Sequence, residues 1–83
     1  MSYTIIIPIH NEKSSTAALL DSLEYYAINN HEILIIDDGS QDGTTELLQD
    51  CNFINLVCFK NNYGKGIAIR KALSIAKYKK III

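Results

Sequence analysis

Four short apolar segments alternate with three amphipathic segments along the chain. The apolar segments are rich in isoleucine, valine and leucine and lie at Tyr3–Ile9, Glu32–Asp37, Phe53–Phe59 and Lys80–Ile83. Short apolar runs of this kind between turn residues are typical of strands that are buried on both faces of a parallel sheet. The pattern therefore predicts four strands.

The three intervening segments show helical spacing of their apolar residues and lie at Ser14–Asn29, Thr44–Gln49 and Gly66–Lys77. The expected buried stripes are Leu19, Leu23, Tyr26 and Ala27 in the first helix and Ile69, Ala72, Leu73 and Ala76 in the third. Asn11 or Ser14 is expected to cap the first helix, and Asp42 the second. The resulting order β-α-β-α-β-α-β predicts a parallel sheet with right-handed crossovers.

The most informative stretch is Glu32–Thr45, in which an apolar run leads directly into Asp37, Asp38 and a Gly-Ser turn. Open α/β sheets bind ligands beyond the carboxyl ends of their strands. We expect both carboxylates to face a crevice at that edge of the sheet.

Two further loops are predicted at the same edge. Pro8–Glu12 follows the first strand, where Pro8 lacks the amide hydrogen that ladder pairing needs. Asn61–Gly66 is a glycine loop that leads into a helix, and free amides at a helix N-terminus favour phosphate. Together the loops suit a ligand with a hydrogen-bonding base at one end and phosphates at the other. The simpler interpretation is that the loop residues serve as turns and caps, and that the basic residues of the last quarter form a solvated helix face.

Composition excludes several classes of protein. The chain has 83 residues, which is one small domain or part of a larger one. A net charge of −1 gives no electrostatic case for nucleic acid or an anionic membrane. Cys51 and Cys58 are too few for a disulfide scaffold, which favours free thiols in a reducing cytoplasm. We also find no signal peptide and no apolar run long enough to span a membrane.

Three familiar ligand motifs are absent or incomplete. The chain has neither the GxGxxG dinucleotide fingerprint nor the GxxxxGK[ST] phosphate loop. Adjacent aspartates after a strand also occur in phospho-acceptor receiver domains. Such a domain needs another Asp at the end of a later strand, where this chain has Lys60 and Asn61.

Three stretches in sequence order, TIIIPIHNE, IIDDGSQDGT and NNYGKGIAIRKAL, resemble the opening of a family-2, inverting glycosyltransferase with the GT-A fold. The chain is similar in particular to the branch that transfers a sugar from a nucleotide diphosphate to a polyprenyl phosphate. This resemblance covers Tyr3–Ile83. It implies a Rossmann-like three-layer α/β/α fold with a parallel sheet in strand order 3-2-1-4. Residues 1–83 would then be a single partial domain, the nucleotide-binding half of the enzyme.

The resemblance also implies a role for each matching residue. Pro8, Ile9 and His10 would line the base, and Glu12 would lie at the base or the ribose. Asp38 would contact uracil or guanine, and Asp37 would support that contact or the ribose. The residues near the diphosphate of a UDP- or GDP-sugar would be Gly64, Lys65 and Arg70. Asp37, Ser40 and Asp42 have an equally good interpretation as turn and cap residues.

The resemblance implies no catalytic residue and no metal ligand within this chain. In the family an Asp-x-Asp motif holds Mg²⁺ or Mn²⁺ against the diphosphate, and it would begin where the sequence stops at Ile83. We therefore expect a truncated chain that is inactive alone, taken from an enzyme that works at the cytoplasmic face of a membrane. A second hypothesis is a non-catalytic binding or assembly module that dimerises through its exposed C-terminal strand.

Overall fold

The computed structural model describes all residues from Met1 to Ile83. Its elements are β1 (Thr4–Ile9), α1 (Lys13–Ile28), β2 (Glu32–Asp38), α2 (Thr44–Gln49), β3 (Asn55–Phe59), α3 (Lys65–Ile75) and β4 (Ile81–Ile82). The predicted alternation of strands and helices is confirmed. The largest shifts in boundary are at the start of β3 and the end of α3, each two residues inside the predicted limit.

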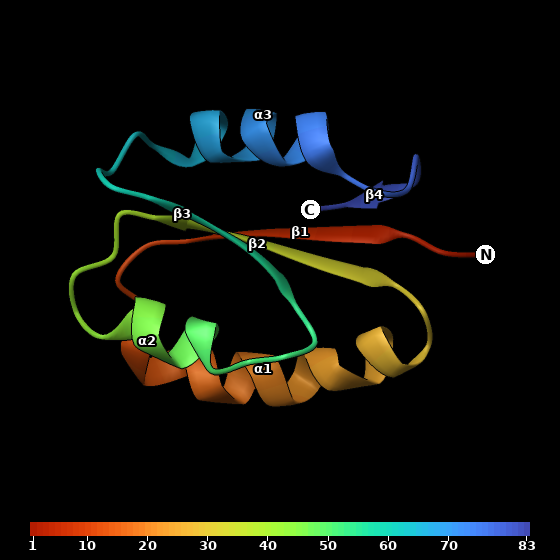
Figure 1. The fold of residues 1–83 in the computed structure, drawn as a ribbon, viewed down its shortest axis with the longest axis horizontal. Coiled ribbons are helices and arrows are strands. Elements are labelled where there is room, and N and C mark those ends of the chain that lie inside the picture. The colour runs from red at the N-terminus through yellow and green to blue at the C-terminus, as the bar shows by residue number, and fades with distance from the viewer.

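The four strands form one parallel sheet in the order β3-β2-β1-β4, as predicted. Helix α3 covers one face of the sheet, and helices α1 and α2 cover the other (Figure 1). Strand β4 is short and pairs only with Thr4 and Ile5 of β1. The result is a three-layer α/β/α arrangement in which the carboxyl ends of β1, β2 and β3 lie at one edge.

Strand β2 lies between β1 and β3, and its residues 33–38 are buried. Leu34 and Ile36 pack on the side of α3, whereas Ile33 and Ile35 pack on the side of α1 and α2. Successive side chains of a strand point to opposite faces of the sheet. The same alternation therefore decides where the two aspartates at the end of β2 point.

The predicted buried stripes of α1 and α3 are confirmed except for one residue in each helix. Leu19, Leu23 and Ala27 of α1, and Ala72 together with Ala76 at the end of α3, pack against the core. Tyr26 of α1 is 43% exposed, and Leu23 is the fully buried apolar residue of that helix. In α3 the buried residues are Ala68 and Ala72, whereas Leu73 is 51% exposed. Ala68 and Ala72 lie one turn apart, and their small side chains bring α3 close to the sheet. With these two residues facing the sheet, Leu73 lies on the outer side of the helix.

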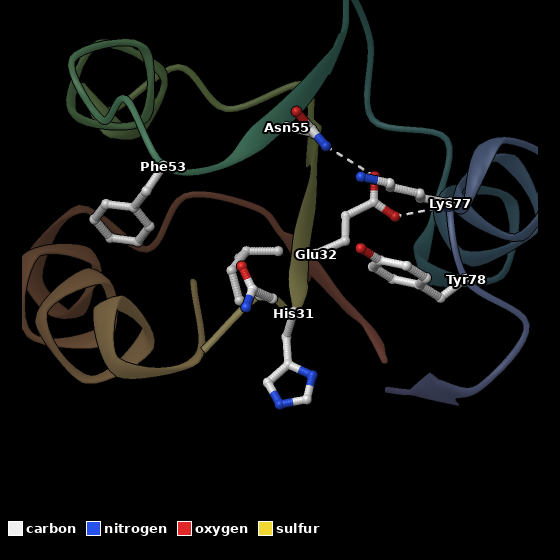
Figure 2. A pocket seen from close by; sticks show the side chains of 8 residues that line it. His31, Glu32, Phe53, Asn55, Lys77 and Tyr78 are labelled. Carbon is white, nitrogen blue, oxygen red and sulfur yellow. Dashed lines mark hydrogen bonds between the residues drawn. The ribbon is translucent and has the colours of Figure 1, made fainter. Parts of the chain in front are cut away.

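A hydrogen-bonded cluster around Glu32 ties the opposite, amino ends of the strands together (Figure 2). The Glu32 carboxylate accepts bonds from the Thr4 hydroxyl at 2.8 Å, the Asn55 amide at 2.8 Å and the Lys77 backbone N–H at 2.7 Å. Burial alone would raise the pKa of Glu32, but these bonds and the Lys77 charge outweigh it and lower that pKa. The cluster borders a hollow of about 220 Å³ that also includes Phe53.

Replacing Glu32 with glutamine is expected to lower the free energy of unfolding by about 1 kcal/mol at pH 7, allowing for solvent screening. A lowered pKa in the folded chain gives stability that is present above the unfolded pKa, about 4.3, and is lost as the pH falls through the folded pKa. Urea unfolding at pH 7 and pH 3 should therefore show a smaller difference between wild type and variant at pH 3. Glu24→Gln, which changes an exposed carboxylate of α1, is the control. A difference independent of pH would contradict this role for the Glu32 charge.

Candidate nucleotide-binding site

The loops after β1 and β2 are joined by hydrogen bonds at the carboxyl edge of the sheet. The Asn11 N–H donates to the Ser40 hydroxyl at 2.9 Å, and the Gln41 N–H donates to the Asn11 side-chain oxygen at 2.8 Å. The Glu12 N–H donates to the Thr44 hydroxyl at 3.0 Å. These bonds explain how Asn11 is held in a left-handed conformation with φ 51°. The two loops form one surface.

Asp42 serves the amino ends of two helices. Its carboxylate accepts the Lys13 N–H of α1 at 3.2 Å and the Thr44 N–H of α2 at 3.0 Å. The N-cap position of α2 is Gly43, so the predicted cap is displaced by one residue. The hydrogen bond from the Thr44 hydroxyl is the largest influence on Asp42 and, with the backbone bonds, lowers its pKa despite partial desolvation.

The predicted caps of α1 are wrong. Glu12 occupies the N-cap position and makes no side-chain cap bond. Neither Asn11 nor Ser14 caps the helix. The acceptor for the Lys13 N–H is instead the carboxylate of Asp42, which lies in the next loop. Local sequence gives no sign of a cap that comes from 29 residues away.

Asp38 holds the glycine loop against the end of β2. Its side chain is buried, and its two oxygens accept the N–H groups of Tyr63 and Gly64, each at 2.8 Å. Gly39 makes the close approach possible, since a Cβ there would lie 2.5 Å from the backbone carbonyl carbon of Asn61. Asp38 and Gly39 together bring the third loop beside the other two.

Asp37 points to the other face of the sheet. Its carboxylate accepts the Ser40 N–H at 3.1 Å and a bond from the Thr45 hydroxyl, both on the side of α2. The expectation that both carboxylates face the crevice is therefore wrong for Asp37, because adjacent residues of a strand point in opposite directions. Asp37 stabilises the turn between β2 and α2.

A cavity of about 550 Å³ lies beside β1, the end of β2 and the start of α3. It is lined by Ile6, Ile7, Pro8, Ile9, His10, Glu12, Asp38, Asn62, Gly64, Lys65 and Ile83. The structure thus brings together every residue implied for the nucleotide except Asp37 and Arg70. Asn62 was missed, and its only sequence signal was its place within the glycine loop.

Arg70 lies outside this cavity and is exposed on α3. At about 100° per residue, it is roughly opposite the Ala68 and Ala72 stripe that packs on the sheet. Lys65, five residues earlier, lies at the start of α3 and lines the cavity. Of the two basic residues implied for the diphosphate, the structure places only Lys65 at the site.

The start of α3 offers backbone donors beside the cavity. The first bond of the helix runs from the Ala68 N–H to the Gly64 carbonyl at 3.2 Å, so the preceding three amides have no partner within the helix. A Cβ added at Gly64 or Gly66 would meet no atom within 4 Å. Lys65 adds a positive charge here, and Asp38, whose carboxylate accepts the Gly64 N–H, lies beside it. The free amides and Lys65 are the groups of the cavity that favour an anion.

The residues present do not fit a divalent metal ion. No group of three or more His, Cys, Asp or Glu side chains lies close enough together to hold one. Asp38 lines the cavity, but both its oxygens bind backbone amides. We assign no step of chemistry through a metal to this chain.

None of its helices is both long and apolar enough to cross a membrane.

Comparison with known proteins gives consistent relatives. The chain is 35% identical over 82 residues to the undecaprenyl-phosphate 4-deoxy-4-formamido-L-arabinose transferase of Aeromonas hydrophila, covering 89% of the chain and 25% of that relative. It is 38% identical over 76 residues to the UDP-Glc:alpha-D-GlcNAc-diphosphoundecaprenol beta-1,3-glucosyltransferase of Escherichia coli, covering 89% of the chain and 30% of the relative.

Among solved structures, the fold is similar to that of the mannosyltransferase PcManGT from Pyrobaculum calidifontis in complex with GDP-Man and Mn²⁺. The TM-score is 0.78 at 26% identity, and the match covers 90% of this chain and 24% of that one. The chain therefore spans about a quarter of the length of these relatives.

The fold is the Rossmann-like amino-terminal half of the GT-A fold, with the strand order expected for it. The profile of the family described as "Glycosyl transferase family 2" matches residues 4–83, almost the whole chain. The chain therefore belongs to glycosyltransferase family 2.

Proposed function

We propose that residues 1–83 are the nucleotide-binding half of a glycosyltransferase domain and hold the nucleotide of a UDP- or GDP-sugar. The observation that carries this proposal is the convergence of three loops on one cavity, which is lined by the Glu12 and Asp38 carboxylates and by Lys65 at the free amides that begin α3. A volume of about 550 Å³ is typical of sites for small organic ligands.

The base is proposed to lie against Pro8, Ile9 and His10, with its N–H groups toward the carboxylates. Each carboxylate oxygen can accept two hydrogen bonds, so Asp38 can accept one from a base while it holds the glycine loop. Glu12 is exposed at the cavity and is available to the base or to a ribose hydroxyl. The diphosphate would lie at Lys65 and the amides that begin α3.

In the whole enzyme, we propose that an acceptor oxygen attacks the anomeric carbon of the donor sugar while the bond to the diphosphate breaks, which inverts that carbon. The relative named as an undecaprenyl-phosphate sugar transferase supports a polyprenyl phosphate acceptor, and we propose that the enzyme works at the cytoplasmic face of a membrane. Residues 1–83 contain no cluster of side chains that could hold a metal ion, and we assign no residue among them as the catalytic base. We therefore expect no transfer of labelled sugar by this chain alone, and detectable transfer would contradict that proposal.

Titration of the chain with UDP, GDP and the corresponding nucleosides tests the binding proposal, with NMR chemical shifts as the readout. Binding of UDP or GDP is expected to shift the amide signals of Gly64 and Lys65. Lys65→Ala should weaken diphosphate binding by about three- to tenfold, because one charged contact contributes about 1 kcal/mol, and leave nucleoside binding unchanged.

Lys79→Ala is the matched control, because Lys79 is exposed and lies outside the cavity. An equal loss in both lysine variants would indicate attraction by the basic side of the molecule rather than a site. Failure of the wild type to bind either nucleotide at millimolar concentration would exclude the proposed function.

The second candidate function is a non-catalytic assembly module. Strand β4 leaves β1 unpaired beyond Ile5 on that side, and Ile82 and Ile83 are 48% and 63% exposed. An open strand edge with apolar side chains can pair with a second chain. Light scattering that finds a discrete dimer without nucleotide affinity would favour this module over the nucleotide-binding half.

A further inference from the structure

The imidazole ring of His10 contacts all three loops that form the cavity. Its Nδ1 lies 2.7 Å from the backbone carbonyl oxygen of Asp38. Its Nε2 lies 3.2 Å from the side-chain nitrogen of Asn11 and 3.2 Å from that of Asn62. One half-buried side chain thus joins the ends of β1 and β2 to the glycine loop.

The orientations of the two asparagine amides are set by other bonds. The Asn11 side-chain oxygen accepts the Gln41 N–H at 2.8 Å, and the Asn62 side-chain oxygen accepts the Gly64 N–H at 3.2 Å. Both amide nitrogens therefore face His10, and an amide nitrogen only donates. The His10 Nε2 must accept these bonds and carries no proton, so the ring proton lies on Nδ1 and is donated to the Asp38 carbonyl.

We infer that His10 is a positioning residue of the nucleotide half-site, and that it holds the glycine loop in place as the neutral tautomer protonated on Nδ1. The expected effect on nucleotide binding rests on the proposed function, whereas the tautomer of His10 does not. On one side the ring bonds to Asn11, whose oxygen accepts the Gln41 N–H of the second loop. On the other side it bonds to Asn62, whose oxygen accepts the Gly64 N–H before α3.

A second proton on the ring is incompatible with this arrangement. The new N–H at Nε2 would face two amide NH₂ groups, and rotating either amide would break the bond that it makes to Gln41 or Gly64. Glu12, Asp38 and Lys65 are the charged groups that line the same cavity, and the attraction of the two carboxylates for the proton is partly offset by the lysine. Protonation should therefore free the glycine loop and weaken nucleotide binding.

The tautomer can be measured directly and without any ligand. Long-range ¹H–¹⁵N correlation of the imidazole ring in ¹⁵N-labelled chain at about pH 8 shows which nitrogen carries the proton. We expect the proton of His10 on Nδ1, and an amide signal of Gly64 that moves with the same midpoint as the His10 ring when the pH is lowered. A proton on Nε2, or a Gly64 signal that ignores the ring, would overturn the inference even if no nucleotide binds.

The functional arm measures affinity for UDP-glucose and GDP-mannose between about pH 8 and pH 5.5, because a sugar-linked diphosphate has no terminal phosphate that titrates there. Wild-type affinity for the sugar nucleotide that binds is expected to be about five- to tenfold lower at a pH at which the correlation spectrum shows the second proton on the His10 ring than at pH 8. His10→Gln and Asn62→Ala should bind less tightly at pH 8 and show a flat profile. A wild-type affinity that does not change with pH, or an equal fall in His10→Gln, would overturn the inference.

His31→Gln is the matched control, because His31 lies at the opposite, amino ends of the strands, where its Nδ1 accepts the Tyr3 N–H. This variant should keep the wild-type pH profile, and circular dichroism at each pH should show that every variant stays folded. If the affinity of His31→Gln did not change with pH, the pH dependence of binding would belong to His31 rather than His10, and the inference would be overturned. Absence of sugar-nucleotide binding in all variants would exclude the proposed function and leave the tautomer and the Gly64 titration as the test of His10.

Discussion

Replacing Gly39 with alanine is expected to lower the free energy of unfolding by about 2–5 kcal/mol. Gly39 has φ +73°, which for an L-residue other than glycine costs about 1–2 kcal/mol. The new Cβ would also lie 2.5 Å from the carbonyl carbon of Asn61 and 2.7 Å from the amide nitrogen of Asn62, and forced overpacking costs about 1–3 kcal/mol more. Both contacts are backbone atoms, so the glycine loop itself would have to move.

Chemical denaturation of wild type and variant measures this effect. Gly66→Ala is the control, because Gly66 lies in the first turn of α3 and an added Cβ there meets nothing within 4 Å. That variant should be unchanged or more stable by up to about 1 kcal/mol, since alanine favours a helix over glycine. A loss below about 0.5 kcal/mol in Gly39→Ala would show that the loop is not packed as described. Nucleotide affinity should fall in Gly39→Ala together with stability.

The alternation of strands and helices and the parallel direction of the strands were predictable from local pattern, whereas the strand order was implied by the resemblance to the family. The apolar runs around Ile33–Ile36 and Ile5–Ile7 are too short for helices, and alternation with helical segments requires parallel crossovers. The same reasoning placed the three loops at one edge, which is why most of the implied nucleotide residues do line one cavity. Chain order carried this information without any knowledge of side-chain contacts.

The side-chain partners were not predictable because they join distant segments. Asp42 caps a helix that begins 29 residues earlier, and His10 contacts Asn62 at a separation of 52 residues. The buried face of α3 depends on how closely Ala68 and Ala72 approach the sheet, which helical spacing alone cannot rank against Leu73. The opposite directions of Asp37 and Asp38 did follow from the period of a strand. The prediction erred there because it ended the strand at Asp37 and directed both carboxylates into one crevice, whereas β2 extends to Asp38.

Replacing Asp38 with alanine is expected to reduce both stability and nucleotide affinity. The carboxylate accepts two backbone N–H groups, and its loss leaves the Tyr63 amide without an acceptor while Gly64 keeps only its 3.2 Å bond to Asn62. Both bonds are partly buried, and loss of a charged acceptor for two such donors is expected to cost about 2–4 kcal/mol. The glycine loop would then lie less closely against the cavity, and affinity for UDP or GDP should fall by at least about tenfold.

Asp37→Ala separates the two neighbouring carboxylates. It removes the acceptor for the Ser40 N–H and the Thr45 hydroxyl, so it too should lower stability by about 1–3 kcal/mol. Asp37 faces the α2 side and lies outside the cavity, so nucleotide affinity of the folded variant should stay within about twofold of wild type. Denaturation and nucleotide titration of both variants, at a temperature where each is folded, give the comparison. If Asp37→Ala lost as much affinity as Asp38→Ala at equal folded fraction, the division of roles between the two faces of β2 would be wrong, because general loosening of the turn would then account for both results.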